Sequence, residues 1–230
     1  MCIRDRHGTK TSAMALGECD LLIVLGSRFS DRVLCNAGTF AKATKIVHIE
    51  IDPAEIGKNI NVDAYVAGDL KYVLAKLNEI LPDLKHSEWM EKIAEWKNKY
   101  ALKMVPVESE DEVLPQDVIE TLDKLTSGEA IITTEVGQHQ MWAAQYYNFR
   151  KPRSFASSGG LGTMGYGLGA AIGSKCGNPD TPVINIAGDG SFFMNCNELS
   201  SLAKHNIPVI ELVFENNVLG MVRQLSLIHI

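Results

Sequence analysis

Short apolar runs in the first third of the chain predict buried parallel strands. Residues 21–26 form the continuous run LLIVLG, and residues 45–52 form the β-branched run KIVHIEID. Runs of this length without alternating polar positions are typical of strands that are covered on both faces. Residues 31–43 can supply a crossover between them, and residues 69–81 have the apolar spacing of a helix. Together these elements predict a Rossmann-like unit over residues 7–82.

A second alternation of strands and helices follows a charged connector. The connector spans residues 83–113 and is expected to contain one amphipathic helix over residues 86–104. Beyond it, over residues 114–224, the strand-like runs AIITT, VINIA and VIELVF alternate with helically spaced segments. These segments include the glycine-rich residues 159–175 and residues 193–205. The pattern predicts the α/β class, with two doubly wound parallel-sheet domains.

Composition and charge narrow the class of protein without indicating a function. The chain has 230 residues, a hydrophobic fraction of 46% and a net charge of -6, which favour a soluble globular protein and disfavour a binder of nucleic acid or of an anionic membrane. No apolar run reaches the roughly 20 residues that a membrane helix needs. The five cysteines are scattered, so we expect buried free thiols and a reducing, cytoplasmic location.

The two ends of the chain look foreign to the rest of it. Residues 1–6 (MCIRDR) and 225–230 (LSLIHI) resemble translated sequencing-adapter DNA. We therefore expect both to be non-native and exclude them from reasoning about the fold. On this interpretation the native gene continues in both directions; the alternative is that they are real termini.

The strongest chemical signal is a pair of motifs, Gly188-Asp189-Gly190 and, after 25 residues, Asn216-Asn217. Each motif follows a predicted strand, so both are expected at the carboxyl edge of a parallel sheet, where open α/β sheets bind ligands. A carboxylate and an amide oxygen suit Mg²⁺, which prefers oxygen ligands and completes its shell with phosphate and water. The glycines would let a diphosphate approach the backbone. The alternative is a plain strand-to-helix turn and an unrelated loop.

This paired motif resembles the GDG and NN signature of thiamine-diphosphate-dependent enzymes. Four further segments resemble one family among them, the acetolactate synthase large subunits: EVGQHQMW (135–142), SGGLGTMGY (158–166), HIEIDPAEIGK (48–58) and GSRFSDRV (26–33). The resemblance covers essentially residues 7–224. It implies that residues 7–82 are the C-terminal part of a central FAD-binding domain, and that residues 114–224 are the N-terminal part of a diphosphate-binding domain.

The resemblance implies sites for Mg²⁺ and for thiamine diphosphate. The metal would be bound by the side chains of Asp189 and Asn217 and by the backbone carbonyl of Leu219, with Asn216 as the alternative to Asn217. Gln138 and His139 would donate hydrogen bonds to the diphosphate. Gly162 would accept one from the aminopyrimidine ring, while Met164 would bend the coenzyme. The full set of implied contacts is Val136, Gly137, Gln138, His139, Gly162, Met164, Gly188, Gly190, Ser191, Gly220 and Met221.

Each of these residues also has a simpler interpretation. Taken alone, His139 could be a capping or core histidine, and Met164 could be an ordinary core residue. The seven glycines between residues 159 and 173 could reflect close packing. Glycine costs a helix interior about 1 kcal/mol relative to alanine, however, so this density predicts that something approaches the backbone closely.

The resemblance also implies FAD in the first unit. An arginine there could pair with the FAD diphosphate through two hydrogen bonds. Ser30 stands where the family usually has aspartate, which weakens any assignment at that position. The alternative is a Rossmann-like domain that binds no nucleotide. The implied contacts are His7, Gly8, Thr9, Gly26, Arg28, Asp31, Arg32, Glu50, Ile51, Gly68 and Asp69.

The implied reaction is the first common step of branched-chain amino acid synthesis. It condenses two pyruvates, or pyruvate with 2-oxobutyrate, with loss of CO₂, in a homodimer or larger assembly with a regulatory small subunit. The family's catalytic glutamate belongs to a pyrimidine-binding domain that would precede residue 7. Neither Glu135 nor Glu198 matches its motif, so no catalytic residue is expected in this chain, which should be inactive alone.

Other functions stay open at this point. A related thiamine-diphosphate-dependent lyase or oxidase, of the pyruvate oxidase or glyoxylate carboligase type, is disfavoured by the segments GQHQMW and HIEIDPAEIGK. A dinucleotide-dependent dehydrogenase is disfavoured because no GxGxxG motif follows a strand. The third alternative is an inactive cofactor-binding remnant.

Overall fold

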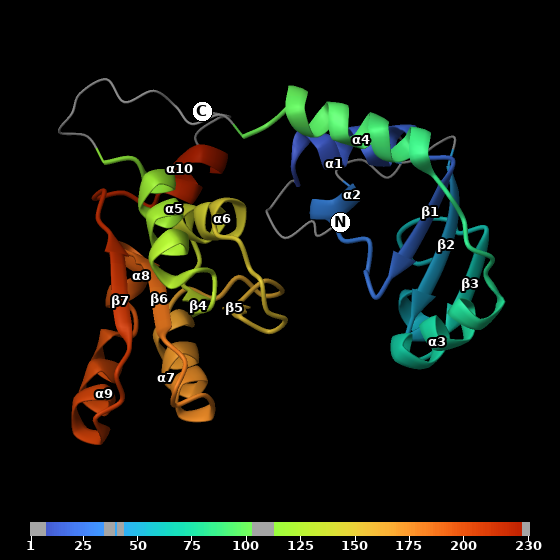
Figure 1. Cartoon of the computed structure of the whole chain (residues 1–230). Coiled ribbons are helices and arrows are strands. Elements are labelled where there is room, and N and C mark those ends of the chain that lie inside the picture. Colours follow the sequence, from blue (N-terminus) through green and yellow to red (C-terminus); the bar gives the residue numbers. More distant parts are fainter. Residues whose placement is uncertain (1–7, 35–39, 41–43, 103–112, 227–230) are drawn as a thin grey trace. The chain divides into compact units, whose positions relative to one another are not determined.

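The computed structural model describes residues 8–34, 40, 44–102 and 113–226, which divide between two compact units (Figure 1). Unit 1 is Met1–Lys103 and unit 2 is Met104–Ile230. Each unit is described by itself. In the described part of the chain, no helix is both long enough and apolar enough to cross a membrane.

Unit 1 contains a three-stranded parallel sheet in the order β1-β2-β3. The strands are β1 (Leu21–Leu25), β2 (Lys45–Glu50) and β3 (Ala64–Ala67). The two apolar runs of the sequence form the parallel strands β1 and β2, as predicted, but the expected burial of β1 was wrong, since Leu21, Ile23 and Leu25 are 47%, 50% and 43% exposed. We did not predict β3, because its four residues AYVA are all exposed and too few to reveal a period.

The described helical segments of unit 1 are α1 (Lys10–Glu18), α2 (Asp31–Leu34), the 3₁₀ turn η1 (Pro53–Glu55), α3 (Leu70–Ile80) and α4 (Ser87–Lys99). Polar side chains cap α1, η1 and α3. The Asp69 carboxylate accepts the amide of Lys71 at 2.9 Å and so satisfies one of the free donors of α3. Helix α4, which lies in the predicted connector, packs along α1: Thr11 donates its hydroxyl to the Trp96 carbonyl at 3.2 Å. Figure 1 shows the two helices side by side.

Unit 2 contains a four-stranded parallel sheet in the order β5-β4-β6-β7. The strands are β4 (Ile131–Thr134), β5 (Phe155–Ser157), β6 (Val183–Gly188) and β7 (Ile210–Phe214). The chain runs from β4 outward to β5 and then crosses back over β4 to β6. The winding direction therefore reverses between β4 and β6, and the carboxyl ends of these strands define the crevice where such sheets bind ligands. The predicted α/β class with two parallel sheets is confirmed.

Two apolar layers cover this sheet. On one face, Ile132 and Ile184 pack with Ile119 of α5 (Pro115–Thr126) and Ala143 of α6 (Gln138–Tyr146). On the other face, Ile131 and Val183 pack with Ala171 of α7 (Gly167–Gly177). Adjacent strand residues point to opposite faces, so the continuous apolar runs reflect this two-sided burial.

Two predicted helices of unit 2 were wrong in extent. The segment 159–175 is helical only from Gly167, because Gly162 and Gly165 have φ values of +73° and +83°, which a right-handed helix excludes. The segment 193–205 is interrupted at Asn195, whose φ is -140°. It comprises the end of α8 (Asp189–Phe193), the turn η2 (Cys196–Glu198) and α9 (Leu199–His205). The last helix is α10 (Gly220–Ser226).

The cysteines are free thiols where the structure describes them. Cys19, Cys176 and Cys196 form no disulfide, as predicted. The expectation that they would be buried was wrong, because Cys176 is exposed and the other two are only partly covered. Cys2 and Cys35 lie outside the described residues.

Candidate functional site

The carboxyl edge of the second sheet brings the two predicted motifs together. Asp189 follows the last residue of β6, and Asn217 lies in the loop after β7. The backbone amide of Asn217 donates a hydrogen bond of 3.1 Å to Oδ2 of Asp189. Strand register explains the meeting, since Gly188 pairs with Phe214 at the ends of the two strands. The spacing of 25 residues is the length of chain that the returning helices require.

The local backbone distinguishes the two asparagines. Oδ1 of Asn216 accepts the amide of Val218 at 3.1 Å and closes a turn within the loop. Asn217 adopts a left-handed conformation with φ +55°, and its side chain is exposed. The Leu219 carbonyl accepts the amide of Arg223 at 2.9 Å, which leaves its second lone pair. Asn216 thus already accepts one hydrogen bond through its side-chain oxygen, whereas the Asn217 side chain forms none with the described residues.

The donor set at this edge suits a hard cation. A carboxylate, a side-chain amide and a backbone carbonyl are the oxygen ligands that Mg²⁺ prefers. Among the described residues, no group of three or more His, Cys, Asp or Glu side chains could hold a metal ion. A metal at Asp189 would thus depend on neutral oxygens and on a bound ligand to complete its shell.

Glycines let three segments approach one another at this edge. A Cβ at Gly190 would lie 2.8 Å from Cδ2 of Leu219, and a Cβ at Gly220 would overlap the Gln138 side chain. A Cβ at Gly188 would lie 3.0 Å from Nδ1 of the His139 ring. The segments after β4, β6 and β7 therefore contact one another at positions where a side chain would separate them.

His139 is the most buried polar side chain among the predicted coenzyme contacts apart from Ser191. It is 5% exposed, and its Nε2 has no hydrogen-bond partner among the described residues. Burial lowers the pKa of His139 to about 4, although a hydrogen bond to the Glu135 backbone and the charge of Asp189 act in the opposite direction. The ring is therefore neutral near pH 7. A buried nitrogen without a partner is unfavourable and suggests that a ligand normally satisfies it.

Two predicted diphosphate contacts already have partners within the chain. The Ser191 hydroxyl donates to the Gly188 carbonyl at 3.1 Å and is almost fully buried, so only its backbone could meet a ligand. Nε2 of Gln138 donates to Oε1 of Gln224 at 3.0 Å, which links α6 to α10. The contact of Gln224 was not predicted, since nothing in its sequence context marks it.

The glycine-rich loop after β5 has open space beside it. No atom lies within 4 Å of a Cβ built at Gly159, Gly160 or Gly162. Gly162 needs its φ of +73°, and Met164 is partly buried. Close packing explains only Gly167, where a Cβ would meet the backbone of β4. Of the other predicted contacts, Val136 and Gly137 lie between β4 and α6, and Met221 lies in α10.

The carboxyl edge of the first sheet gathers residues predicted to bind FAD. The amide of Gly26 bonds to the Ile49 carbonyl at 2.9 Å, and that of Gly68 bonds to the Glu50 carbonyl at 3.0 Å. Gly26 has a φ of +60°, and Asp69 caps the helix that follows. Three strand ends therefore lie at one edge, the edge at which open α/β sheets bind ligands.

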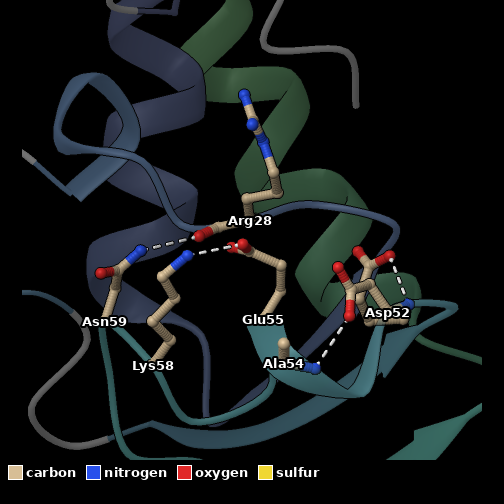
Figure 2. A network of polar contacts seen from close by, with 7 residues as sticks. Arg28, Asp52, Ala54, Glu55, Lys58 and Asn59 are labelled. Atoms are coloured by element: carbon tan, nitrogen blue, oxygen red, sulfur yellow. Dashed lines mark hydrogen bonds and ion pairs between the residues drawn. The ribbon is translucent and has the colours of Figure 1, made fainter.

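Figure 2 shows the polar contacts at this edge. Nδ2 of Asn59 donates to the Arg28 carbonyl at 3.1 Å and so fixes the backbone of the loop after β1. The Arg28 side chain is exposed and points away from the ion pair of Lys58 and Glu55, which measures 2.7 Å. Asp52 accepts the Ala54 amide at 2.9 Å and starts η1.

The remaining predicted FAD contacts are less closely grouped. Thr9 caps α1 by accepting the Ser12 amide at 3.1 Å, and Gly8 has a φ of +69°. Ile51 is 67% exposed. Asp31 and Arg32 open α2, and His7 lies outside the described residues.

Two family models match the chain. "Thiamine pyrophosphate enzyme, central domain" matches residues 3–77, and "Thiamine pyrophosphate enzyme, C-terminal TPP binding domain" matches residues 135–229. The chain belongs to the thiamine pyrophosphate enzyme family. The second match contains the edge at which Asp189 and Asn217 meet, so the site lies in the family's coenzyme-binding domain.

Several curated relatives are named acetolactate synthase. The chain is 48% identical to a probable acetolactate synthase large subunit of Methanococcus aeolicus, over 95% of this chain and 39% of the relative. It is 48% identical to the chloroplastic acetolactate synthase 1 of Nicotiana tabacum, over 95% of this chain and 33% of the relative. It is 46% identical to the acetolactate synthase large subunit of Parasynechococcus marenigrum, over 95% of this chain and 35% of the relative. The chain thus spans between a third and two fifths of the length of these relatives.

Sequence reasoning set Glu135 aside because it does not match the family's catalytic motif. In the structure this side chain is fully buried, and its Oε1 accepts the amide of Leu168 at 3.2 Å. Its position directly after a predicted strand was a signal, since residues there lie at the ligand-binding edge.

Proposed function

We propose that this chain is part of an acetolactate synthase large subunit that condenses two pyruvates, or pyruvate with 2-oxobutyrate, with release of CO₂. The observation that carries the proposal is the contact between Asp189 and Asn217 at the carboxyl edge of the second sheet. The names of the curated relatives support it.

The coenzyme of this proposal is thiamine diphosphate held by Mg²⁺. Asp189, Asn217 and the Leu219 carbonyl bind the metal, and their oxygen atoms suit it. His139 meets the diphosphate end, an assignment supported by its buried Nε2 without a partner. When bound, the coenzyme supplies the electron sink for decarboxylation, while the protein positions it and excludes water. Gly162 and Met164 face the rings of the coenzyme in this proposal.

The first unit binds FAD in this proposal. The convergence of Gly26, Glu50 and Gly68 at one sheet edge supports the assignment. The exposed Arg28 is available for the FAD diphosphate, with which a guanidinium can form two parallel hydrogen bonds. The domain limits of this proposal are residues 7–82, 83–113 and 114–224.

The active enzyme in this proposal is a homodimer or larger assembly with a regulatory small subunit. A glutamate beside the pyrimidine ring comes from a domain that this chain does not include. The 230-residue chain is therefore expected to bind coenzyme without turning over pyruvate. A gene completed from the source DNA should produce acetolactate from pyruvate; a different product, such as acetyl phosphate, would overturn the assignment.

Calorimetric titration of the chain with thiamine diphosphate tests the site directly. We expect binding with Mg²⁺ present and none with excess EDTA. Asp189→Asn should weaken Mg²⁺-dependent binding by at least about tenfold, because it removes the charged ligand. Asp180→Asn is the matched control, since Asp180 is exposed in a loop away from this edge. Equal affinities of the two variants, or no binding by the unaltered chain, would refute the proposed site.

A further inference from the structure

Glu135 is a buried acid to which the proposed function assigns no role. It is the first residue after β4, it is 0% exposed, and its amide donates to the Ile186 carbonyl at 3.0 Å. The backbone here thus continues the pairing of β4 with β6 for one more residue. The side chain is held at the centre of the carboxyl edge, where β4 and β6 diverge.

The carboxylate of Glu135 meets the backbone that leads into α7. The Leu168 amide donates to Oε1 at 3.2 Å, and the amides of Gly165, Tyr166 and Gly167 lie close enough to favour the ionised carboxylate. The first amides of a helix have no partner within the helix, and a negative charge there is favourable. The Leu168 amide thus forms the hydrogen bond to this buried side chain, the neighbouring amides of residues 165–167 favour its ionised form, and its Oε2 has no partner among the described residues.

Because both groups are buried, the Glu135 side chain and the backbone at the start of α7 each need the other as a hydrogen-bond partner. Desolvation raises the pKa of Glu135, and the four amides act in the opposite direction. A carboxylate without hydrogen bonds is very unfavourable inside a protein. The Leu168 amide would also lose its acceptor if the side chain were removed, so the conformation at the start of α7 depends on Glu135.

Close packing removes alternative positions for the start of α7. A Cβ at Gly167 would lie 2.7 Å from the Glu135 nitrogen and 2.8 Å from the Thr134 carbonyl carbon. The helix therefore begins in direct contact with the end of β4. Its first turn cannot shift sideways without moving the sheet.

Two further hydrogen bonds stabilise the loop between β5 and α7, one within the loop and one to Asn195. The Thr163 amide donates to the Ser158 hydroxyl oxygen at 3.0 Å. Nδ2 of Asn195 donates to the Gly165 carbonyl at 3.2 Å. The loop is therefore held at its beginning by Ser158 and at its end by Asn195 and Glu135. Gly162 and Met164 lie between these ends.

We infer that Glu135 is a positioning residue: by accepting the Leu168 amide at the start of α7, it sets the conformation of the loop that presents Gly162 and Met164 to the coenzyme. This inference rests on the proposed function, because it assumes that the coenzyme lies against that loop. Glu135 itself touches neither coenzyme nor substrate in this role.

The test compares Glu135→Ala, Glu135→Gln and the unaltered chain, with Glu129→Gln as the control. Glu129 is exposed and pairs only with Lys151 at the surface, a contact of little energetic weight. Hydrogen exchange measured by mass spectrometry on the coenzyme-free chain reports on residues 158–168. Calorimetric titration with thiamine diphosphate and Mg²⁺ reports on the coenzyme.

We expect Glu135→Ala to speed exchange of the Leu168 amide by about tenfold or more, and exchange of residues 165–167 by less, because the hydrogen bond of Leu168 to the Glu135 side chain is lost. Exchange in β6 should stay unchanged. Glu135→Gln should lie between, since its amide oxygen still accepts but carries no charge. The dissociation constant for thiamine diphosphate should rise in the same order, with Glu129→Gln matching the unaltered chain.

Three results would overturn the inference. The first is unaltered exchange of residues 158–168 in both Glu135 variants, and the second is faster exchange with unaltered coenzyme affinity. The third is an unaltered chain that binds no thiamine diphosphate, which overturns the proposed function and the coenzyme role together; the first two leave the proposed function standing. If Glu135→Ala does not fold, Glu135→Gln decides by the same criteria.

Discussion

Replacing Gly167 with alanine tests how closely α7 approaches the second sheet. The added Cβ would overlap Oδ1 of Asn185 and would lie 2.7 Å from the Glu135 nitrogen and 2.8 Å from the Thr134 carbonyl carbon. Two of these three atoms are backbone atoms of the β4 segment, which cannot rotate away. The helix must move outward, or the sheet must distort.

The magnitude follows from the cost of overpacking, which is about 1–3 kcal/mol for one added methyl group in a tightly packed site. Gly173→Ala in the same helix is the matched control, because no atom lies within 4 Å of a Cβ built there. Alanine favours a helix interior over glycine by about 1 kcal/mol, so this control should stabilise unit 2. Replacing glycine with alanine should therefore destabilise unit 2 at residue 167 and stabilise it at residue 173.

A urea titration that is monitored by hydrogen exchange of peptides from β4 and β6 measures the stability of unit 2 separately from that of unit 1. With a urea dependence of about 2 kcal/mol per M, Gly167→Ala should lower the transition midpoint by about 1 M, and Gly173→Ala should raise it by a few tenths. Equal shifts for the two variants would refute the packing argument. So would stabilisation by both, which would mean that α7 adjusts without cost.

Three further predictions concern charge, packing and capping. Burial raises the pKa of Glu211 from 4.5 to about 7, so the folded chain binds an extra proton and the free energy of unfolding falls as pH rises through this window. His139, whose pKa is lowered to about 4, makes the free energy of unfolding rise with pH between about pH 4 and 6.5. The quantity to measure is therefore the difference in free energy of unfolding between the unaltered chain and Glu211→Gln. This difference should vanish below about pH 4.5, and a difference independent of pH would contradict the assignment. Ile119→Ala should cost about 2–5 kcal/mol in urea denaturation, because this fully buried side chain joins α5 to the sheet, and a loss under 1 kcal/mol would contradict that packing. Asp69→Ala should cost about 1 kcal/mol through loss of the α3 cap whereas Asp69→Ser retains most of it, and equal losses would argue against capping.

The apolar runs of the sequence were sufficient to predict five of the strands. Strands β1, β2, β4, β6 and β7 coincide with these runs, although only β2, β4 and β6 are largely buried, and β1 and β7 each have exposed apolar side chains. Strands β3 and β5 have only four and three residues, and their neighbours in the sheet, not their composition, make them strands. Periodicity over so few residues carries no information.

The motifs likewise predicted the edge of the candidate site, because the carboxyl ends of parallel strands must meet on one side of a sheet. The sequence thus determined that Asp189 and the asparagine pair lie near each other. Only the tertiary structure decided that Asn216 closes a turn, that Ser191 faces inward and that Glu135 holds the first turn of α7. These outcomes depend on local φ angles and on distances of a few tenths of an ångström between segments far apart in the chain, which a pattern of residue types does not contain.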